Sequence, residues 1–212
     1  MKVTKLKYTK RGNRVSIYID EEFILSIEKN LIVDLEIFKG KQVTGKDIKE
    51  WKNADLYEKL YGKVIDLIAR RPRSRKEIEN YLRVKLYKVK SRYKITKRVI
   101  SKLKNKGYID DHKFASWWVS HRILFKPRGK FLIIQELRQK GVNSDIISEA
   151  LEEAGLDSES EMKYALELGR KKKRSLDNLE DEKKKRKFFN FLSRKGFVYS
   201  TIRKVYEKLK VD

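Results

Sequence analysis

Apolar and polar side chains alternate along the first 27 residues of the chain. Every second residue is apolar from Val15 to Ile19 and again from Phe23 to Ile27, and Gly12-Asn13 and Asp20-Glu21 separate these runs. A period of two places alternate side chains on one face of a strand, and Gly, Asn and Asp are residues that tight turns prefer. The pattern predicts a small antiparallel β-meander with one apolar face.

A helical spacing follows the meander. Apolar residues lie three or four positions apart between Glu28 and Phe38, and Gly40 stands where a helix end needs left-handed backbone. We expect a short helix here that covers the sheet. Thr44 is a candidate N-cap for a longer stretch, since apolar residues recur from Ile48 to Ile68 as one helix or two in series. No strand is predicted after this point.

The rest of the chain contains an internal repeat of 55 residues. The segments Tyr81 to Lys85, Glu136 to Lys140 and Phe191 to Lys195 align at this spacing. The only two prolines, Pro72 and Pro127, are also 55 residues apart. Three copies of one helical unit explain this periodicity.

Each copy is interpreted as three helices. The candidate caps are Ser74 with Glu77 in a capping box, Thr96, Asp110, Asn143 or Ser144, and Ser158 with Glu161 in a second box. This gives a head of β-meander and helix over 1–60 and three-helix repeats over 61–109, 110–156 and 157–212. Repeats of this kind bury their apolar stripes on one another and on immediate neighbours. The expected fold class is therefore mainly α, an elongated, curved array with small local cores.

The charge is strongly positive and unevenly distributed. The 212 residues carry 54 Lys or Arg and 30 Asp or Glu, a net charge of +24. Between Arg70 and Lys106 there are 16 basic and only two acidic residues, whereas Asp145 to Glu167 carries eight acids and one Lys. A basic stretch of this density is typical of a surface that meets a phosphate backbone. For the lysine runs near residues 171 and 185 we favour a solvated helix face.

The amino-acid composition limits which catalytic, metal-binding and membrane functions the protein can have. The chain has no Cys and two His, and no segment approaches the roughly 18 apolar residues of a membrane span. We expect a soluble, cytoplasmic, monomeric protein with no membrane contact, no cofactor, no metal and no enzymatic activity. Asp110 and Asp111 beside His112 could suggest a metal site, but a helix N-cap with a favourable first-turn charge is the simpler interpretation.

Candidate binding residues concentrate in the basic stretch. Arg70, Arg71, Arg73 and Arg75 crowd a helix break, where guanidinium groups can meet phosphate or carboxylate oxygens. We favour such contact over charge pairing at the helix end. The next group combines cations with two aromatic rings: Lys85, Lys88, Lys90, Arg92 and Lys94, with Tyr87 and Tyr93. Nucleic-acid bases could stack on these rings. The alternative is that the rings pack inward and the lysines only solubilise the loop. Around the second proline, Arg122, Lys126 and Arg128 complete the candidates for contact with DNA or a partner protein.

An aromatic cluster in the second repeat has a different interpretation. Phe114, Trp117, Trp118 and His121 follow the i, i+3, i+4, i+7 pattern of a wide buried stripe. We favour a core position over a base-stacking platform, because a helix presents a stacking ring less readily than an open sheet does.

Several of these segments together resemble the bacterial RecX proteins. The resemblance covers about residues 62 to 209, and the head is similar to an N-terminal extension that some members carry. The chain departs from the family pattern in the long, basic segment Leu86 to Lys94, where a Gly turn would be usual. The matching segments are Ile68-Ala69-Arg70-Arg71-Pro72-Arg73-Ser74, Gly107-Tyr108-Ile109-Asp110-Asp111 with Phe114-Ala115, Arg122, Gly129, Glu136-Leu137, Lys140-Gly141-Val142 and Ala150-Leu151.

What the resemblance implies is a regulator of the RecA recombinase. Family members are built from three tandem three-helix repeats. They lodge in the groove of the RecA filament on DNA and mostly inhibit ATP turnover and strand exchange, in recombination, repair and the SOS response. The implied partners are the RecA filament and single-stranded DNA, with double-stranded DNA as a further candidate. Inhibition by occupying the filament groove needs binding and no catalytic group. This agrees with the scarcity of side chains suited to catalysis in the sequence.

Two rival functions stay open at the level of the sequence. A general nucleic-acid-binding helical repeat would bind bare DNA or RNA tightly enough for its function. A metal-dependent nuclease centred on Asp110 and Asp111 would lose its activity in chelator.

Overall fold

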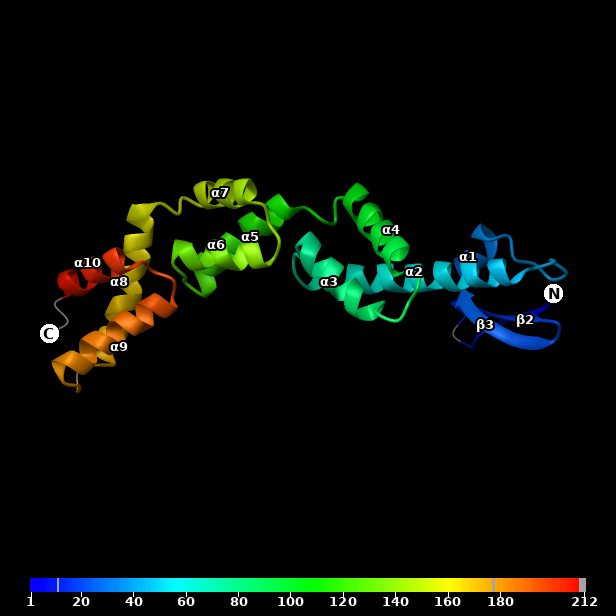
Figure 1. Ribbon diagram of the computed structural model, residues 1–212, viewed down its shortest axis with the longest axis horizontal. Coiled ribbons are helices and arrows are strands. Elements are labelled where there is room, and N and C mark those ends of the chain that lie inside the picture. The colour runs from blue at the N-terminus through cyan, green and yellow to red at the C-terminus, as the bar shows by residue number, and fades with distance from the viewer. Residues whose placement is uncertain (11, 177, 210–212) are drawn as a thin grey trace. The chain divides into compact units, whose positions relative to one another are not determined.

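The computed structural model describes residues 1–10, 12–176 and 178–209, which form three strands and ten helices (Figure 1). The backbone contacts divide the chain into two compact units. The first comprises Met1–Arg71 with Ile78–Tyr108, and the second comprises Pro72–Glu77 with the chain from Ile109 onward. The mainly α fold class with a small antiparallel sheet is confirmed.

The head contains the predicted meander. Strands β1 (Val3–Tyr8), β2 (Arg14–Ile19) and β3 (Glu22–Glu28) are antiparallel in the order β1-β2-β3. The expectation that Phe23 lies on the apolar face is wrong, because its side chain is 57% exposed. The register shifts between Ile17 and Tyr18, so one extra residue of β3 turns Phe23 to the opposite face, where its ring meets Tyr18 edge-on at 5.8 Å.

Two helices follow the sheet. Helix α1 (Lys29–Asp34) is shorter than predicted, because Glu36 adopts a left-handed conformation (φ 50°) and ends the element before Phe38. Helix α2 (Gly45–Arg70) is one continuous helix. Its predicted cap is confirmed, since the Thr44 hydroxyl accepts from the Asp47 N–H and the Asp47 carboxylate accepts from the Thr44 N–H. Leu31 of α1 and Trp51 of α2 complete the apolar core over the sheet.

Eight further helices form the region with the 55-residue period, and no strand occurs among the described residues after β3. The predicted caps at Asp110 and Asn143 are confirmed, and Ser74 accepts from the Glu77 N–H as expected. The eight helices are α3 (Arg75–Lys85), α4 (Arg92–Asn105), α5 (Asp111–Phe125), α6 (Lys130–Gln139), α7 (Ser144–Glu153), α8 (Ser158–Arg174), α9 (Asp181–Arg194) and α10 (Tyr199–Leu209).

Two predicted caps are wrong. Thr96 lies inside α4, because a series of tight turns after the buried Leu86 starts this helix at Arg92, one turn earlier than predicted. The cap of α8 is Asp157 and not Ser158, since the Asp157 carboxylate accepts from the Ser160 N–H at 2.8 Å. The predicted boundaries between the repeats stay a prediction.

The expected small local cores are confirmed in the second unit. Phe114, Ile133 and Ile147 centre one core over α5, α6 and α7, while Phe188 and Val205 centre a separate core over α8, α9 and α10. Trp117 and Trp118 pack against the first of these cores, which confirms their interpretation as part of the buried stripe.

Consecutive repeats share one type of junction within this unit. The Ser74 hydroxyl donates to the Lys140 carbonyl at 2.7 Å, and the Gly129 N–H donates to the Lys195 carbonyl at 2.8 Å. Both donors stand at the start of a second helix, both acceptors stand at the end of the second helix of the next repeat, and each bond spans 66 residues. The start of the second helix of one repeat therefore contacts the end of the second helix of the next repeat: α3 contacts α6, and α6 contacts α9.

A carboxylate completes each junction. The Arg75 N–H, at the start of α3, donates to Asp111 at 2.9 Å, and the Lys130 N–H, at the start of α6, donates to Glu161 at 2.8 Å. Both carboxylates come from the first turn of the following repeat's first helix. They satisfy backbone donors that a helix start leaves free, and they lie at its positive end.

Candidate nucleic-acid and partner interface

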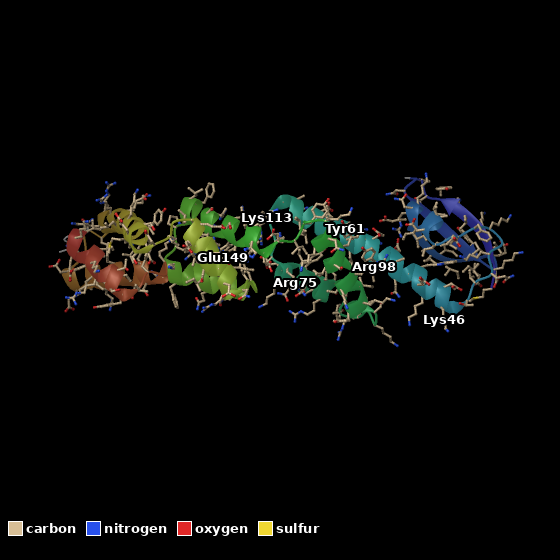
Figure 2. The ribbon with its side chains drawn as sticks, turned by 90° about the horizontal axis from the view of Figure 1, so that it is seen from above. Lys46, Tyr61, Arg75, Arg98, Lys113 and Glu149 are labelled. Carbon is tan, nitrogen blue, oxygen red and sulfur yellow. The ribbon has the colours of Figure 1, made fainter. Side chains whose placement is uncertain are left out.

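The four arginines at the first helix break are distributed over both units. Arg70 is exposed in the last turn of α2, and Arg71 is the C-cap of that helix. Arg73 is half-buried, and Arg75 is the exposed first residue of α3 (Figure 2). The Arg75 backbone N–H donates to Asp111. The division between the units falls after Arg71.

The cations between α3 and α4 are exposed with their tyrosines. Tyr87 is 65% exposed and Tyr93 is 78% exposed, so the alternative in which these rings pack inward is wrong. The Lys88 ammonium lies 5.2 Å from the centre of the Tyr87 ring. The five predicted cations of this segment are all exposed: Lys85, Lys88, Lys90, Arg92 and Lys94.

Helix α4 extends the predicted candidate Lys94 into a row of cations, of which the sequence analysis missed Arg98, Lys102 and Lys106. Lys94, Arg98, Lys102 and Lys106 follow one another at intervals of four residues, with the last one at the C-cap. Residues four apart lie on the same face of a helix, so these side chains form one stripe. The spacing was visible in the sequence, and projection of the basic stretch onto a helix would have found it.

Two tyrosines of α2 hold part of this stripe in place. The rings of Tyr57 and Tyr61 stack with 6.3 Å between their centres. The Arg98 guanidinium lies 4.2 Å from the centre of the Tyr57 ring, and the Lys102 ammonium lies 4.3 Å from that of Tyr61. Arg98 and Tyr61 are labelled in Figure 2. These contacts are cation–π interactions between α4 and α2.

Lys102 is the one member of the stripe with a described ion pair. Its ammonium lies 3.5 Å from the Glu58 carboxylate. Burial lowers the pKa of Lys102, but Glu58 and Tyr57 raise that pKa by more, so it lies above its ordinary value. Lys102 therefore remains charged and anchors α4 to α2.

The three candidates of the second repeat have different environments. Arg122 is only 14% exposed and donates to Glu136 at 2.6 Å, so its charge is used inside the repeat. Arg128 is half-buried and donates to the Arg194 carbonyl at 3.4 Å. Lys126 is exposed directly after α5.

Asp110 and Asp111 both bind backbone N–H groups. Asp110 accepts from His112 and Lys113 as the cap of α5, and Asp111 accepts from Arg75 at the repeat junction. The expectation of a helix cap is confirmed for Asp110. Over residues 1–10, 12–176 and 178–209, no group of three or more His, Cys, Asp or Glu side chains is placed to hold a metal ion. No helix in this part of the chain is both long and apolar enough to span a membrane.

These features define a class of protein: a basic helical-repeat protein with a small sheet at its head and with exposed clusters of cations and rings. The chain belongs to the RecX family of regulatory proteins. Three family models match it: the regulatory protein RecX N-terminal domain over residues 1–44, the RecX second three-helix domain over 110–151 and the RecX third three-helix domain over 159–206.

Relatives and solved structures agree with this membership. The chain is 34% identical to the regulatory protein RecX of Clostridium botulinum, over 98% of this chain and 95% of that protein. It is 29% identical to the one from Clostridioides difficile, over 98% and 95%. A crystal structure of regulatory protein RecX matches with a TM-score of 0.69 at 27% identity, over 100% of this chain and 99% of that one.

Proposed function

We propose that the protein regulates the RecA recombinase by binding the RecA filament on single-stranded DNA and lowering its ATP turnover and strand exchange. The observation that carries this proposal is the similarity to regulatory RecX proteins over almost the whole chain, head and repeats together. The proposal makes RecA and DNA the partners and assigns no catalytic step to the protein itself.

The charge and the repeat support this mode of action. A recombinase filament on DNA presents the same protein surface at regular intervals beside a phosphate backbone. A protein with repeated modules, each with a separate core, can contact successive subunits with similar surfaces. Its net charge of +24 favours association with the negative filament and accelerates their encounter. Occupancy of the filament is sufficient for inhibition, because it competes with the other strands and subunits that need the same surface.

The decisive experiment is a titration of the protein into RecA that is hydrolysing ATP on single-stranded DNA. We expect substoichiometric protein to suppress the hydrolysis. The control is an unrelated DNA-dependent ATPase at the same DNA concentration, which should keep its activity unless the protein merely sequesters DNA. Unchanged RecA hydrolysis at an equimolar ratio would contradict the proposal. Electron microscopy of RecA filaments with and without the protein then identifies where it binds.

A general nucleic-acid-binding function is the second candidate, and the cationic stripe of α4 favours it. In that case bare DNA or RNA would bind tightly, and both ATPases in the titration would lose activity together as the DNA becomes covered. Affinity for nucleic acid is expected under both functions. The comparison of the two ATPases therefore distinguishes the two candidate functions, whereas a salt titration of DNA binding does not.

A further inference from the structure

A groove of about 750 Å³ runs along α4 beside α2, inside the first unit. Among the described residues that line it are five Lys or Arg side chains, two tyrosines, a serine and an asparagine, and no carboxylate. An adjoining hollow of about 510 Å³ shares Tyr57, Lys94 and Arg98 with this groove and continues towards α1. The carboxylates of Asp34, Glu50 and Glu58 line this second hollow, so the proposal concerns the groove alone.

The cations of the groove are regularly spaced. Lys94, Arg98, Lys102 and Lys106 are separated by four residues each, which is about 6 Å along a helix that rises 1.5 Å per residue. A parallel line of side chains beside it begins with Tyr93 and Lys97. Regular positive charge at this interval suits a phosphodiester strand stretched beyond the 3.4 Å spacing of the B-form.

Most of these charges are available to a ligand. Lys94, Lys97 and Lys106 are exposed, and none of the three forms an ion pair with a carboxylate in the described part of the chain. Arg98 is exposed as well, but the Tyr57 ring holds its guanidinium 4.2 Å from the ring centre. A positioned guanidinium loses less conformational freedom when it binds an oxygen anion than a mobile one does.

We propose that this groove binds a single strand of nucleic acid, with phosphates along the Lys94, Arg98 and Lys106 stripe and a base stacked on Tyr93. The Tyr93 ring is 78% exposed at the end of the groove, and exposed rings beside cations are the elements of single-strand binding. The apolar side chains that line this groove are tyrosines only, so an acidic protein helix would find no aliphatic contact for its apolar face. The inference adds a strand-binding surface to the proposed function, and its test requires no recombinase.

The test measures binding of fluorescent oligo-dT by anisotropy over a range of salt concentrations. The variant is Lys94→Gln, Lys97→Gln and Lys106→Gln together, and the matched control is Lys163→Gln, Lys185→Gln and Lys204→Gln, which removes the same charge from exposed positions of α8, α9 and α10. We expect the groove variant to lose at least about tenfold in affinity and its log-log salt slope to fall by about 0.7 for each phosphate contact removed. The control should keep the slope of the wild type.

A second pair of variants tests the stacking. Tyr93→Ala should weaken oligo-dT binding by about tenfold while Tyr93→Phe retains it, because the ring and not the hydroxyl provides the stacking surface. Tyr199→Ala is the matched control, since this ring is 68% exposed on α10, does not line the groove, and its loss should leave affinity unchanged. All substituted side chains are exposed, so equal melting temperatures confirm that each variant is folded.

The outcomes separate this inference from the proposed function. Equal affinity and slope for the groove variant and its control would overturn the strand-binding site, even if RecA hydrolysis is still suppressed. A groove variant that binds oligo-dT normally but no longer suppresses RecA would also overturn it, and would assign the groove to an acidic surface of the recombinase. Loss of oligo-dT binding with suppression intact supports the site and shows that inhibition works without it.

Discussion

At the scale of single residues, two cations share the indole ring of Trp118. The Arg122 guanidinium and the Lys140 ammonium each lie 4.3 Å from its centre, and its ring N–H donates to Glu136 at 2.9 Å. Lys140 also pairs with Glu77 at 2.7 Å, so one connected network joins the start of α3 to the second repeat. The Lys140 charge thus serves cohesion between repeats and the Arg122 charge serves cohesion within its own repeat, and we therefore leave Arg122 out of the proposed binding surface.

Two glycines that follow helices, Gly196 after α9 and Gly155 after α7, give a prediction at the same scale. Gly196 has a φ of +90°, and a Cβ at this position would collide with the Leu132 side chain of the preceding repeat. Gly155 has a φ of +60°, but a Cβ there would meet open space. We expect Gly155→Ala to lower the free energy of unfolding by about 1 kcal/mol and Gly196→Ala to lower it by about 2–4 kcal/mol, because only the latter adds a steric clash to the backbone strain.

Urea denaturation of both variants checks this expectation. Equal losses for the two would show that the junction tolerates the extra methyl group. The wild type and Gly107→Ala, which has positive φ (+69°) and open space like Gly155, calibrate the cost of the backbone alone.

At the scale of elements, hydrogen-bonded carboxylates fix where helices begin. The Ser160 backbone N–H and side chain hold the pKa of Asp157 below its ordinary value, and the Thr44 side chain and N–H do the same for the pKa of Asp47. A depressed pKa means that the folded state binds the proton less readily than the unfolded state. The stabilisation is therefore present above the unfolded pKa of about 3.9 and is lost as the pH falls through the folded pKa.

A comparison of wild type with Asp157→Asn tests this sign. Asn caps a helix without titrating, so the wild type should be the more stable of the two near neutral pH, and the difference should shrink in acid, below the unfolded pKa of about 3.9. Urea midpoints near neutral pH and in acid are the measurement. Glu159→Gln removes the same charge from the same first turn without removing the cap, and it serves as the control. A difference that persists in acid would contradict the assignment to this carboxylate.

The elements also show which parts of the fold are predictable from sequence. The 55-residue period and residues such as Asp110 and Asn143 sufficed to locate the helices, because caps and apolar spacing are local signals. The errors arose where a neighbouring element decides the outcome. A bulge in β3 reversed Phe23, and the turn that follows the buried Leu86 started α4 before Thr96.

The candidate site was less predictable than the fold for the same reason. The cations around Tyr93 are predictable from the local density of Lys and Arg in the sequence, whereas the exposure of the ring is not. The pairing of Arg122 inside its repeat and the positioning of Arg98 on Tyr57 are contacts between elements distant in sequence. Such contacts leave no local pattern, so a count of charges cannot distinguish a binding arginine from a structural one.

At the scale of the whole molecule, stability is divided among separate cores. The head core contains Ile17 and Trp51, while the cores of the second unit contain Phe114 and Phe188 respectively. In a repeat protein each module depends mainly on its own core and on its nearest neighbours. Local opening of one module is therefore expected at a free energy below that of complete unfolding.

Hydrogen exchange on a core variant tests this division. Phe188 is fully buried, and Phe188→Ala should destabilise its module by about 3–5 kcal/mol. We expect faster amide exchange in α8, α9 and α10, with unchanged protection in β2. Ile17→Ala in the head is the reciprocal control and should give the opposite pattern. Uniform acceleration along the chain in both variants would instead indicate a single cooperative unit.

The 66-residue hydrogen bonds from Ser74 to Lys140 and from Gly129 to Lys195 have a consequence for how such a chain can lengthen. The donors of the two junctions, Ser74 and Gly129, occupy equivalent positions of consecutive repeats, and so do the acceptors, Lys140 and Lys195. The middle repeat therefore carries both a donor position, at Gly129, and an acceptor position, at Lys140. A duplicated middle module would meet its own copy through an interface that already exists. Tandem duplication of the gene segment for this module would therefore reuse the hydrogen-bonding positions of the existing junctions.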